Sequence, residues 1–154
     1  MTRILMVCLG NICRSPLAHG ILQSKLSENH FYVDSAGTAA YHIGKKPDYR
    51  SVEVAKKYNL DISKQKARQF KARDFDSFDY IFAMDQSNYS NIISLARDNR
   101  DIGKVKLFLE DNTSIINKNV PDPYYGDDDG FERVYTLIET TCELIAQKLL
   151  SNTG

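Results

Sequence analysis

The sequence lacks three features: a long apolar run, a set of paired cysteines and an excess of charge of either sign. No stretch approaches the roughly 18 to 20 apolar residues that a membrane-spanning helix requires, so we expect a soluble protein with no membrane partner. Three cysteines are an odd number and favour free thiols in a reducing compartment, which predicts a cytoplasmic protein. The 20 basic and 20 acidic residues balance, so bulk charge gives no reason to expect a nucleic-acid partner.

The composition is that of a folded protein of moderate size. The chain has 154 residues, of which 42% are hydrophobic and 26% charged, enough to bury a core without disulfides or metal. No internal repeat, low-complexity tract or linker divides it. We therefore expect residues 1–154 to form a single domain. We expect a monomer, and leave weak self-association open.

Short apolar runs alternate with helical patterns along the chain. Strands are predicted at residues 4–8, 31–33, 80–83 and 105–108, the second ending in a turn-rich segment at 34–37. Apolar residues at helical spacing follow each of the first three strands, and a long amphipathic helix covers 131–149, with the acidic run 127–129 near its start. Alternation of this kind predicts a three-layer α/β/α fold around a central four-stranded parallel sheet. Ligands bind beyond the carboxyl ends of such strands, and the first strand ends at Cys8.

The segment between that strand and the following helix has the features of an anion cradle. Gly10 permits backbone geometry that a side chain forbids, and Asn11 tolerates a left-handed conformation. Ser15 is expected to cap the helix, and Pro16 suits its first turn. Unpaired N–H groups and the positive end of the helix dipole then face the inside of the loop, which suits a tetrahedral oxyanion.

Two residues of this segment carry its chemistry. A thiolate is favoured over a thiol at a helix N-terminus beside an arginine, so Cys8 is expected to be ionised at neutral pH. Arg14 supplies a planar fork of donors for two phosphate oxygens. Cys13 either forms a reversible disulfide with Cys8 or packs beneath the loop, and both readings stay open. Cys142 falls on the apolar stripe of the last helix, where core packing is expected.

The string VCLGNICRSP at residues 7–16 resembles the low-molecular-weight protein tyrosine phosphatases. Further segments match that family in order: VDSAGT at 33–38, KARQ at 66–69, FDYI at 78–81, MD at 84–85 and DPYYG at 122–126. The resemblance covers nearly the whole chain. It implies a Rossmann-like or flavodoxin-like fold and hydrolysis of phosphotyrosine and small aryl phosphates through a cysteinyl-phosphate intermediate. A phosphotyrosine-containing protein is then the substrate, inorganic phosphate is a product, and no cofactor or metal is needed.

The resemblance also assigns roles to individual residues. It implies that Cys8 is the nucleophile, that Arg14 clamps the phosphate, and that Asp122 is the general acid and then the general base. Asp122 precedes Pro123, which biases it to an extended conformation. The loop residues expected to surround the phosphate are Leu9, Gly10, Asn11, Ile12, Cys13 and Ser15. The expected pocket walls are Tyr41, Tyr124 and Tyr125, with Ser35 and Asn11 holding the loop and Ser15 stabilising the thiolate.

One departure and two rival functions stand beside this interpretation. Gln65 occupies a position where relatives often have histidine. Glutamine can replace the hydrogen bonds of that histidine but not its titrating charge. A thiolate in such a loop could instead attack arsenate, but that chemistry needs a resolving thiol within reach. An inactive phosphotyrosine-binding module would be expected to have lost Cys8 or Asp122. His19, His30 and His42 are scattered and are expected to be surface or satisfied residues rather than ligands.

Overall fold

The computed structural model describes residues 1–126 and 128–153. Its elements alternate as the sequence predicts. In chain order they are β1 (Thr2–Cys8), α1 (Arg14–Lys25), β2 (Phe31–Gly37), α2 (Tyr49–Lys57), α3 (Asp74–Ser77), β3 (Tyr80–Ala83), α4 (Gln86–Ile93), α5 (Asn99–Gly103), β4 (Val105–Leu107), the 3-10 turns η1 (Phe108–Asp111) and η2 (Pro123–Tyr125), and α6 (Asp128–Thr153). Asp127, expected near the start of the last helix, lies outside the described residues.

The four strands form one parallel sheet in the order β2-β1-β3-β4. Residues 4–8 of the central strand β1 are buried, which explains why this strand is a continuous apolar run rather than an alternating pattern. The parallel four-stranded sheet predicted from the sequence is thereby confirmed.

Two strand ends differ from the prediction. Residues 34–37, expected to form a turn, continue β2, because they pair with β1 as far as Cys8↔Gly37. β4 ends at Leu107, because the fully buried Phe108 begins the turn η1. The longer β2 matters for the site, since it brings Gly37 alongside the end of β1.

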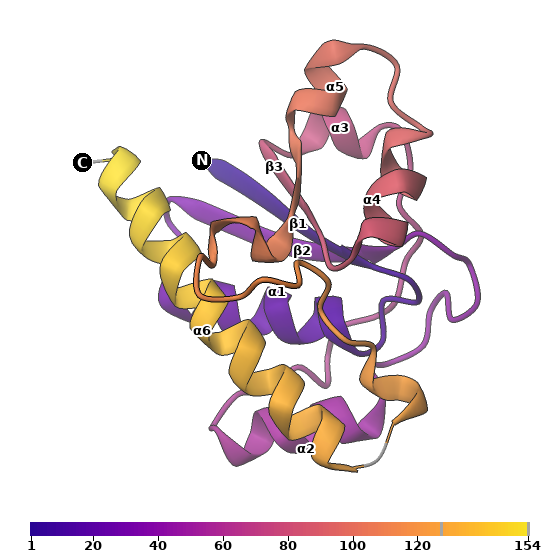
Figure 1. The fold of residues 1–154 in the computed structure, drawn as a ribbon, viewed down its shortest axis with the longest axis vertical. Helices are drawn as coiled ribbons and strands as arrows, with labels where there is room; N and C mark the ends of the chain where they lie inside the picture. Colours follow the sequence, from indigo (N-terminus) through magenta and orange to yellow (C-terminus); the bar gives the residue numbers. More distant parts are fainter. Residues whose placement is uncertain (127, 154) are drawn as a thin grey trace.

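Helices cover both faces of the sheet (Figure 1), which confirms the three-layer arrangement. On one side α1, α2 and α6 pack over Ile4, Met6 and Phe82. On the other side α3 and α4 pack over Leu5 and Val7. The apolar stripe of α6 is buried as predicted, and Cys142 in that stripe is 0% exposed.

The carboxyl ends of β1, β2 and β3 meet at one edge of the sheet. Gly37 shows how tightly they meet, because a Cβ atom there would lie 2.8 Å from the carbonyl oxygen of Leu9. Only glycine leaves room for the loop after β1 to lie on β2. In the described part of the chain, no helix has both the length and the apolar character needed to cross a membrane.

Candidate active site

The loop after β1 is held from outside by its carbonyl groups. The amides of Thr38, Ala39 and Asp48 donate to the carbonyls of Cys8, Leu9 and Ile12 at 2.9, 2.9 and 2.8 Å. Because the C=O and N–H of a trans peptide point in opposite directions, carbonyls that face outward turn the next amides inward. The loop is therefore lined by N–H groups, a concave arrangement that binds anions.

Asn11 fixes the shape of this loop. Its φ of 57° is the left-handed conformation that the sequence predicts. Its side chain also makes two hydrogen bonds: Nδ2 donates to Ser15 Oγ at 2.8 Å, and Oδ1 accepts from the amide of Arg68 at 3.0 Å. Asn11 thus forms the bend of the loop and also connects the loop to the segment that contains Arg68.

Ser15 contacts the sulfur of Cys8 rather than capping the helix. The helix begins at Arg14, so the expectation that Ser15 is the cap is wrong; its hydroxyl lies inside the first turn, 3.0 Å from Cys8 Sγ. Ser15 Oγ accepts from Asn11, so its own proton points either to the sulfur or to the carbonyl of Ala36, which is farther away at 3.5 Å. The amide of Asn11 also donates to Cys8 Sγ at 3.3 Å. Both donors stabilise negative charge on the sulfur.

Gly10 is required for space and not for an unusual backbone angle. Among the described residues, only Asn11, Asn59 and Gly44 have positive φ, so the conformational reason expected for Gly10 is wrong. A Cβ atom at Gly10 would instead lie 2.9 Å from His42 Cδ2. The side chain of His42 therefore lies directly over the loop.

Arg14 is buried beneath the pocket, at 2% exposure. Its Nη1 donates to Asp85 Oδ2 at 2.7 Å and to the carbonyl of Val120 at 3.0 Å. Burial alone lowers the pKa of Arg14, but the negative charge of Cys8, the hydrogen bond that Arg14 donates to Asp85 and the charge of Asp122 outweigh burial and raise that pKa above its ordinary value. The guanidinium is a fixed positive charge whose orientation is set by its partners.

Asp122 lies beside Arg14 and faces the guanidinium nitrogen that Asp85 does not bind. Its Oδ2 lies 3.6 Å from Arg14 Nη2, and its Oδ1 accepts from the amide of Tyr124 at 3.0 Å. The backbone of Asp122 is extended before Pro123, as the sequence predicts. The segment just before Asp122 is bound next to the end of β3, because the amide of Val120 donates to the carbonyl of Met84 at 2.8 Å.

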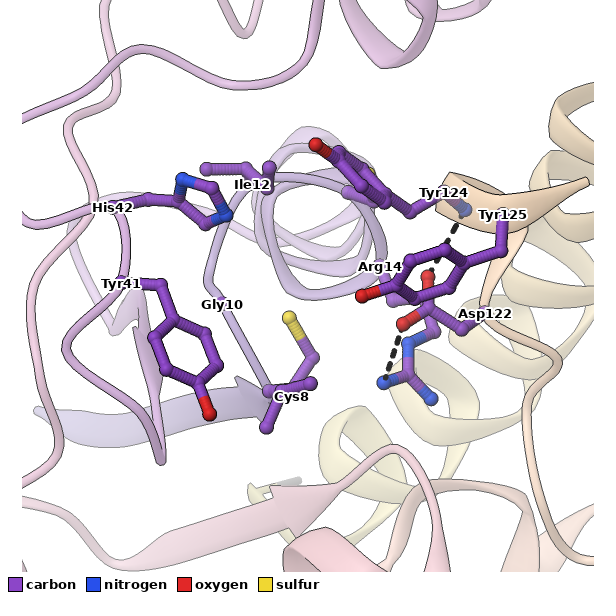
Figure 2. Close-up of a pocket in the computed structure, with 11 residues that line it drawn as sticks. Cys8, Gly10, Ile12, Arg14, Tyr41, His42, Asp122, Tyr124 and Tyr125 are labelled. Atoms are coloured by element: carbon purple, nitrogen blue, oxygen red, sulfur yellow. Dashed lines mark hydrogen bonds and ion pairs between the residues drawn. The ribbon is translucent and has the colours of Figure 1, made fainter.

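These groups line one pocket, shown in Figure 2. Tyr41 and His42 stand on one side of the Cys8 thiol, and Tyr124, Tyr125 and Asp122 stand on the other. The full lining consists of Cys8, Leu9, Gly10, Ile12, Cys13, Arg14, Tyr41, His42, Asp122, Tyr124 and Tyr125. The three tyrosines expected as walls therefore lie at the mouth.

His42 was expected to be a surface or satisfied residue, yet it lines the pocket. Its ring centroid lies 6.4 Å from that of Tyr41 and 6.3 Å from that of Tyr124. The sequence signal for this position is that His42 directly follows Tyr41, a residue expected in the pocket wall. In the described part of the chain, no group of three or more His, Cys, Asp or Glu side chains is arranged to hold a metal ion.

Ser35 contacts helix α1 and, in the part of the chain that the structure describes, makes no hydrogen bond to the loop. Its hydroxyl lies 3.0 Å from Nδ1 of His19. Burial lowers the pKa of His19 below its ordinary value, although the charge of Asp34 acts the other way. Gln65 lies at the same helix, where its Nε2 donates to the carbonyl of Pro16 at 3.1 Å.

All three cysteines are free thiols, and all three are buried. Burial, followed by the charges of Asp48, Cys8 and Asp122, raises the pKa of Cys13, so its thiol remains protonated at neutral pH. Burial likewise raises the pKa of Cys142, whose Sγ donates to the carbonyl of Ala18 at 3.8 Å within the core. Cys142 is therefore inaccessible as a resolving thiol for Cys8. A disulfide between Cys8 and Cys13 stays a prediction.

Comparison with known proteins gives a consistent result. Residues 3–153 match the family model described as low molecular weight phosphotyrosine protein phosphatase. The low molecular weight phosphotyrosine protein phosphatase of Schizosaccharomyces pombe is 44% identical over 138 residues, which are 86% of this chain and 87% of that protein.

Two solved structures are similar over their whole length. A protein tyrosine phosphatase from Entamoeba histolytica, solved with Hepes in the active site, has a TM-score of 0.91 and 36% identity and covers 100% of both chains. YfkJ from Bacillus subtilis has a TM-score of 0.92 and 35% identity, over 100% of this chain and 98% of that one.

Proposed function

The chain belongs to the low molecular weight phosphotyrosine protein phosphatase family and is a hydrolase, and from this we propose the roles of its individual residues. Cys8 is the nucleophile, Arg14 holds the phosphate and Asp122 transfers the proton. The observation that carries this proposal is the convergence of Arg14 on Asp122 at 3.6 Å beside a sulfur that accepts a hydrogen bond from the amide of Asn11 and lies 3.0 Å from Ser15 Oγ.

In the first step, the Cys8 thiolate attacks phosphorus and an S–P bond forms. The bond between phosphorus and the tyrosyl oxygen breaks, and that oxygen takes the proton of the Asp122 carboxyl group. The inward amides of the loop and the fork of Arg14 hold the three equatorial oxygens of the transferring phosphoryl group. The hydrogen bond from Ser15 stabilises the sulfur before the attack.

In the second step, water attacks the phosphorus of the cysteinyl phosphate. The Asp122 carboxylate accepts a proton from that water, the S–P bond breaks, and sulfur leaves as the thiolate with Ser15 donating to it. Inorganic phosphate is released and the enzyme is returned to its starting state. One carboxyl group thus acts as acid and then as base.

The aromatic residues at the mouth account for the preference for aryl phosphates. The substrates of this family are phosphoproteins. We propose that Tyr41 and Tyr124 flank the phosphotyrosine ring, with Tyr125 at the rim. Stacking of this kind adds about 0.5 to 1.5 kcal/mol. We further propose a monomer of one domain acting in the cytoplasm, which agrees with its three free thiols.

The test is hydrolysis of p-nitrophenyl phosphate, a phosphotyrosine peptide and a phosphoserine peptide by the wild type, Cys8→Ser and Asp122→Ala. We expect turnover of the aryl phosphates, loss of turnover in Cys8→Ser, and a fall of about 10²- to 10⁴-fold in Asp122→Ala on the phosphotyrosine peptide. Acid-quenched wild type should carry a phosphate on Cys8 by mass spectrometry. Thiol-dependent reduction of arsenate without phosphatase activity would contradict the proposal.

A further inference from the structure

Arg50, near the start of α2, contacts the loop that carries Asp122. Its Nη2 donates to the carbonyl of Tyr124 at 3.3 Å. Its guanidinium also lies against two rings of that region, 5.5 Å from the centroid of Tyr124 and 4.6 Å from that of Phe131 in α6. Arg50 thus contacts the 3-10 turn η2 by one hydrogen bond and by packing against Tyr124, and it also packs against α6 at Phe131.

The same guanidinium is fixed at its other edge by Asp48. Nε donates to Asp48 Oδ1 and Nη2 to Asp48 Oδ2, both at 3.0 Å, a bidentate pair with fixed geometry. Asp48 Oδ1 also accepts from the amide of Arg50 at 2.9 Å, which caps helix α2. The side chains are only 9% and 23% exposed, so the pair is better protected from water than a surface ion pair.

Asp48 is in turn bonded to the phosphate-binding loop. Its amide donates to the carbonyl of Ile12 at 2.8 Å, and the next residue but two, Ser51, bonds the carbonyl of Cys13 at 3.4 Å. A continuous path of hydrogen bonds therefore runs from the loop around Cys8, through Asp48 and Arg50, to the backbone beside Asp122. The path joins segments that are far apart in the sequence but lie side by side at α2 (Figure 1).

The Asp122 loop has one anchor before the carboxylate and one after it. Val120 provides the first, through its bonds to Met84 and Arg14. Arg50 provides the second, at Tyr124, whose own amide donates to Asp122 Oδ1. Loss of Arg50 therefore removes the side-chain hydrogen bond to the turn that follows Asp122.

We propose that Arg50 is a positioning residue that, through Asp48, sets the distance between the Asp122 carboxyl group and the phosphate-binding loop. The inference rests on the proposed role of Asp122 as the acid. A loss of Arg50 should then damage proton transfer to the leaving group more than it damages phosphate binding or attack by sulfur. A displacement of about 1 Å can cost on the order of 100-fold in rate.

The experiment compares two esters that differ in their need for an acid. p-Nitrophenolate is a good leaving group and needs little protonation, whereas the phenolate of phenyl phosphate needs the proton. We expect Arg50→Met to lower kcat/KM for phenyl phosphate about 10- to 100-fold and for p-nitrophenyl phosphate less than about threefold, with an unchanged inhibition constant for inorganic phosphate. Arg50→Lys keeps the charge without the fork and should rescue little.

Asp48→Asn is the second variant, because asparagine still caps a helix but forms no ion pair with Arg50. Asp48→Asn should lower kcat/KM for phenyl phosphate relative to kcat/KM for p-nitrophenyl phosphate, as Arg50→Met does, but by a smaller factor. Lys57→Met is the matched control: Lys57 also joins α2 to α6, through Glu132 at 3.1 Å, but touches neither loop of the site. In Lys57→Met, the ratio of kcat/KM for the two esters should equal that of the wild type.

Equal losses on the two esters in Arg50→Met and Asp48→Asn would overturn the inference and leave the proposed function standing. The same would follow if Lys57→Met changed the ratio as much as Arg50→Met. A wild type that hydrolyses neither ester would overturn the proposed function and this inference with it. Thermal unfolding of each variant shows that the comparison is made on folded protein.

Discussion

Arg14 and Asp85 form a partly buried ion pair in which the two side-chain oxygens of Asp85 have separate partners. Oδ2 accepts from Arg14 Nη1 at 2.7 Å, and Oδ1 accepts from the amide of Asn88 at 2.8 Å and so caps α4. The start of α4, at the end of β3, therefore determines how the guanidinium faces the pocket. The Asp85 carboxylate thus both caps a helix and orients the arginine that is proposed to bind phosphate.

Replacing Asp85 by asparagine separates these tasks, because asparagine caps helices as well as aspartate does. We expect Asp85→Asn to lower kcat/KM for phosphotyrosine about 10-fold or more, since a hydrogen bond to a charged group contributes about 1.5 to 3 kcal/mol. The cap of α4 should be retained. Asp98→Asn is the control, because Asp98 caps α5 in the same way without contacting Arg14. Equal activity in the two variants would contradict the prediction.

The left-handed backbone of Asn11 allows a comparison of two substitutions at one position. Asn11→Gly and Asn11→Ala lose the same side-chain hydrogen bonds, but only alanine is strained at positive φ, by about 1 to 2 kcal/mol. We expect Asn11→Ala to have the lower free energy of unfolding in urea, by about 1 kcal/mol. An alanine variant as stable as the glycine variant would show that the loop relaxes out of this conformation.

His19 should make the stability of the protein depend on pH. Because burial lowers its pKa in the folded state below the ordinary value of 6.5, the unfolded chain binds a proton more readily. This contribution to stability is therefore complete above pH 6.5 and is lost as the pH falls towards the folded pKa. We expect the free energy of unfolding of His19→Gln to change less than that of the wild type between about pH 7.5 and 5.5. If the free energy of unfolding changed equally with pH in the wild type and in His19→Gln, the prediction would be contradicted.

Tyr41 should contribute to substrate recognition and not to phosphate binding. It is 72% exposed in the absence of substrate, yet it lines the pocket. Tyr41→Ala should lower kcat/KM for a phosphotyrosine peptide about two- to tenfold, as expected for one lost aromatic contact. Inhibition by inorganic phosphate should be unaffected. Tyr49→Ala is a suitable control, because Tyr49 is 74% exposed and does not line the pocket.

The sequence predicted those parts of the site that are local in the chain. The loop after β1 and the bend at Asn11 depend on neighbouring residues, and both are present in the structure. The contact of Ser15 with Cys8 was implied by the family resemblance, whereas the helix cap expected at Ser15 and the backbone angle expected at Gly10 were wrong. Gly10 instead lies under His42, a contact that only the folded chain creates.

Long-range partners could not be predicted in this way. The sequence gives no reason to predict a role for Arg50 or Asp48, because an aspartate two residues before an arginine is ordinary at the start of a helix. Their importance arises only when Ile12 and Tyr124, each at least 36 positions from Asp48, are brought to α2. Ser35 shows the reverse case: its place beside the loop was predicted, but its hydroxyl bonds His19 instead.

The loop whose carbonyls are bound by Thr38, Ala39 and Asp48 owes its polarity to the backbone. Peptide dipoles do not depend on which side chain a position carries, so mutation of the reacting groups leaves them in place. On the proposed roles, a descendant that lost Cys8 would stop turning over its substrate but would still bind it. In evolutionary terms, this fold is a phosphate receptor to which one sulfur and one carboxylate add catalysis, and a binding protein is a single substitution away.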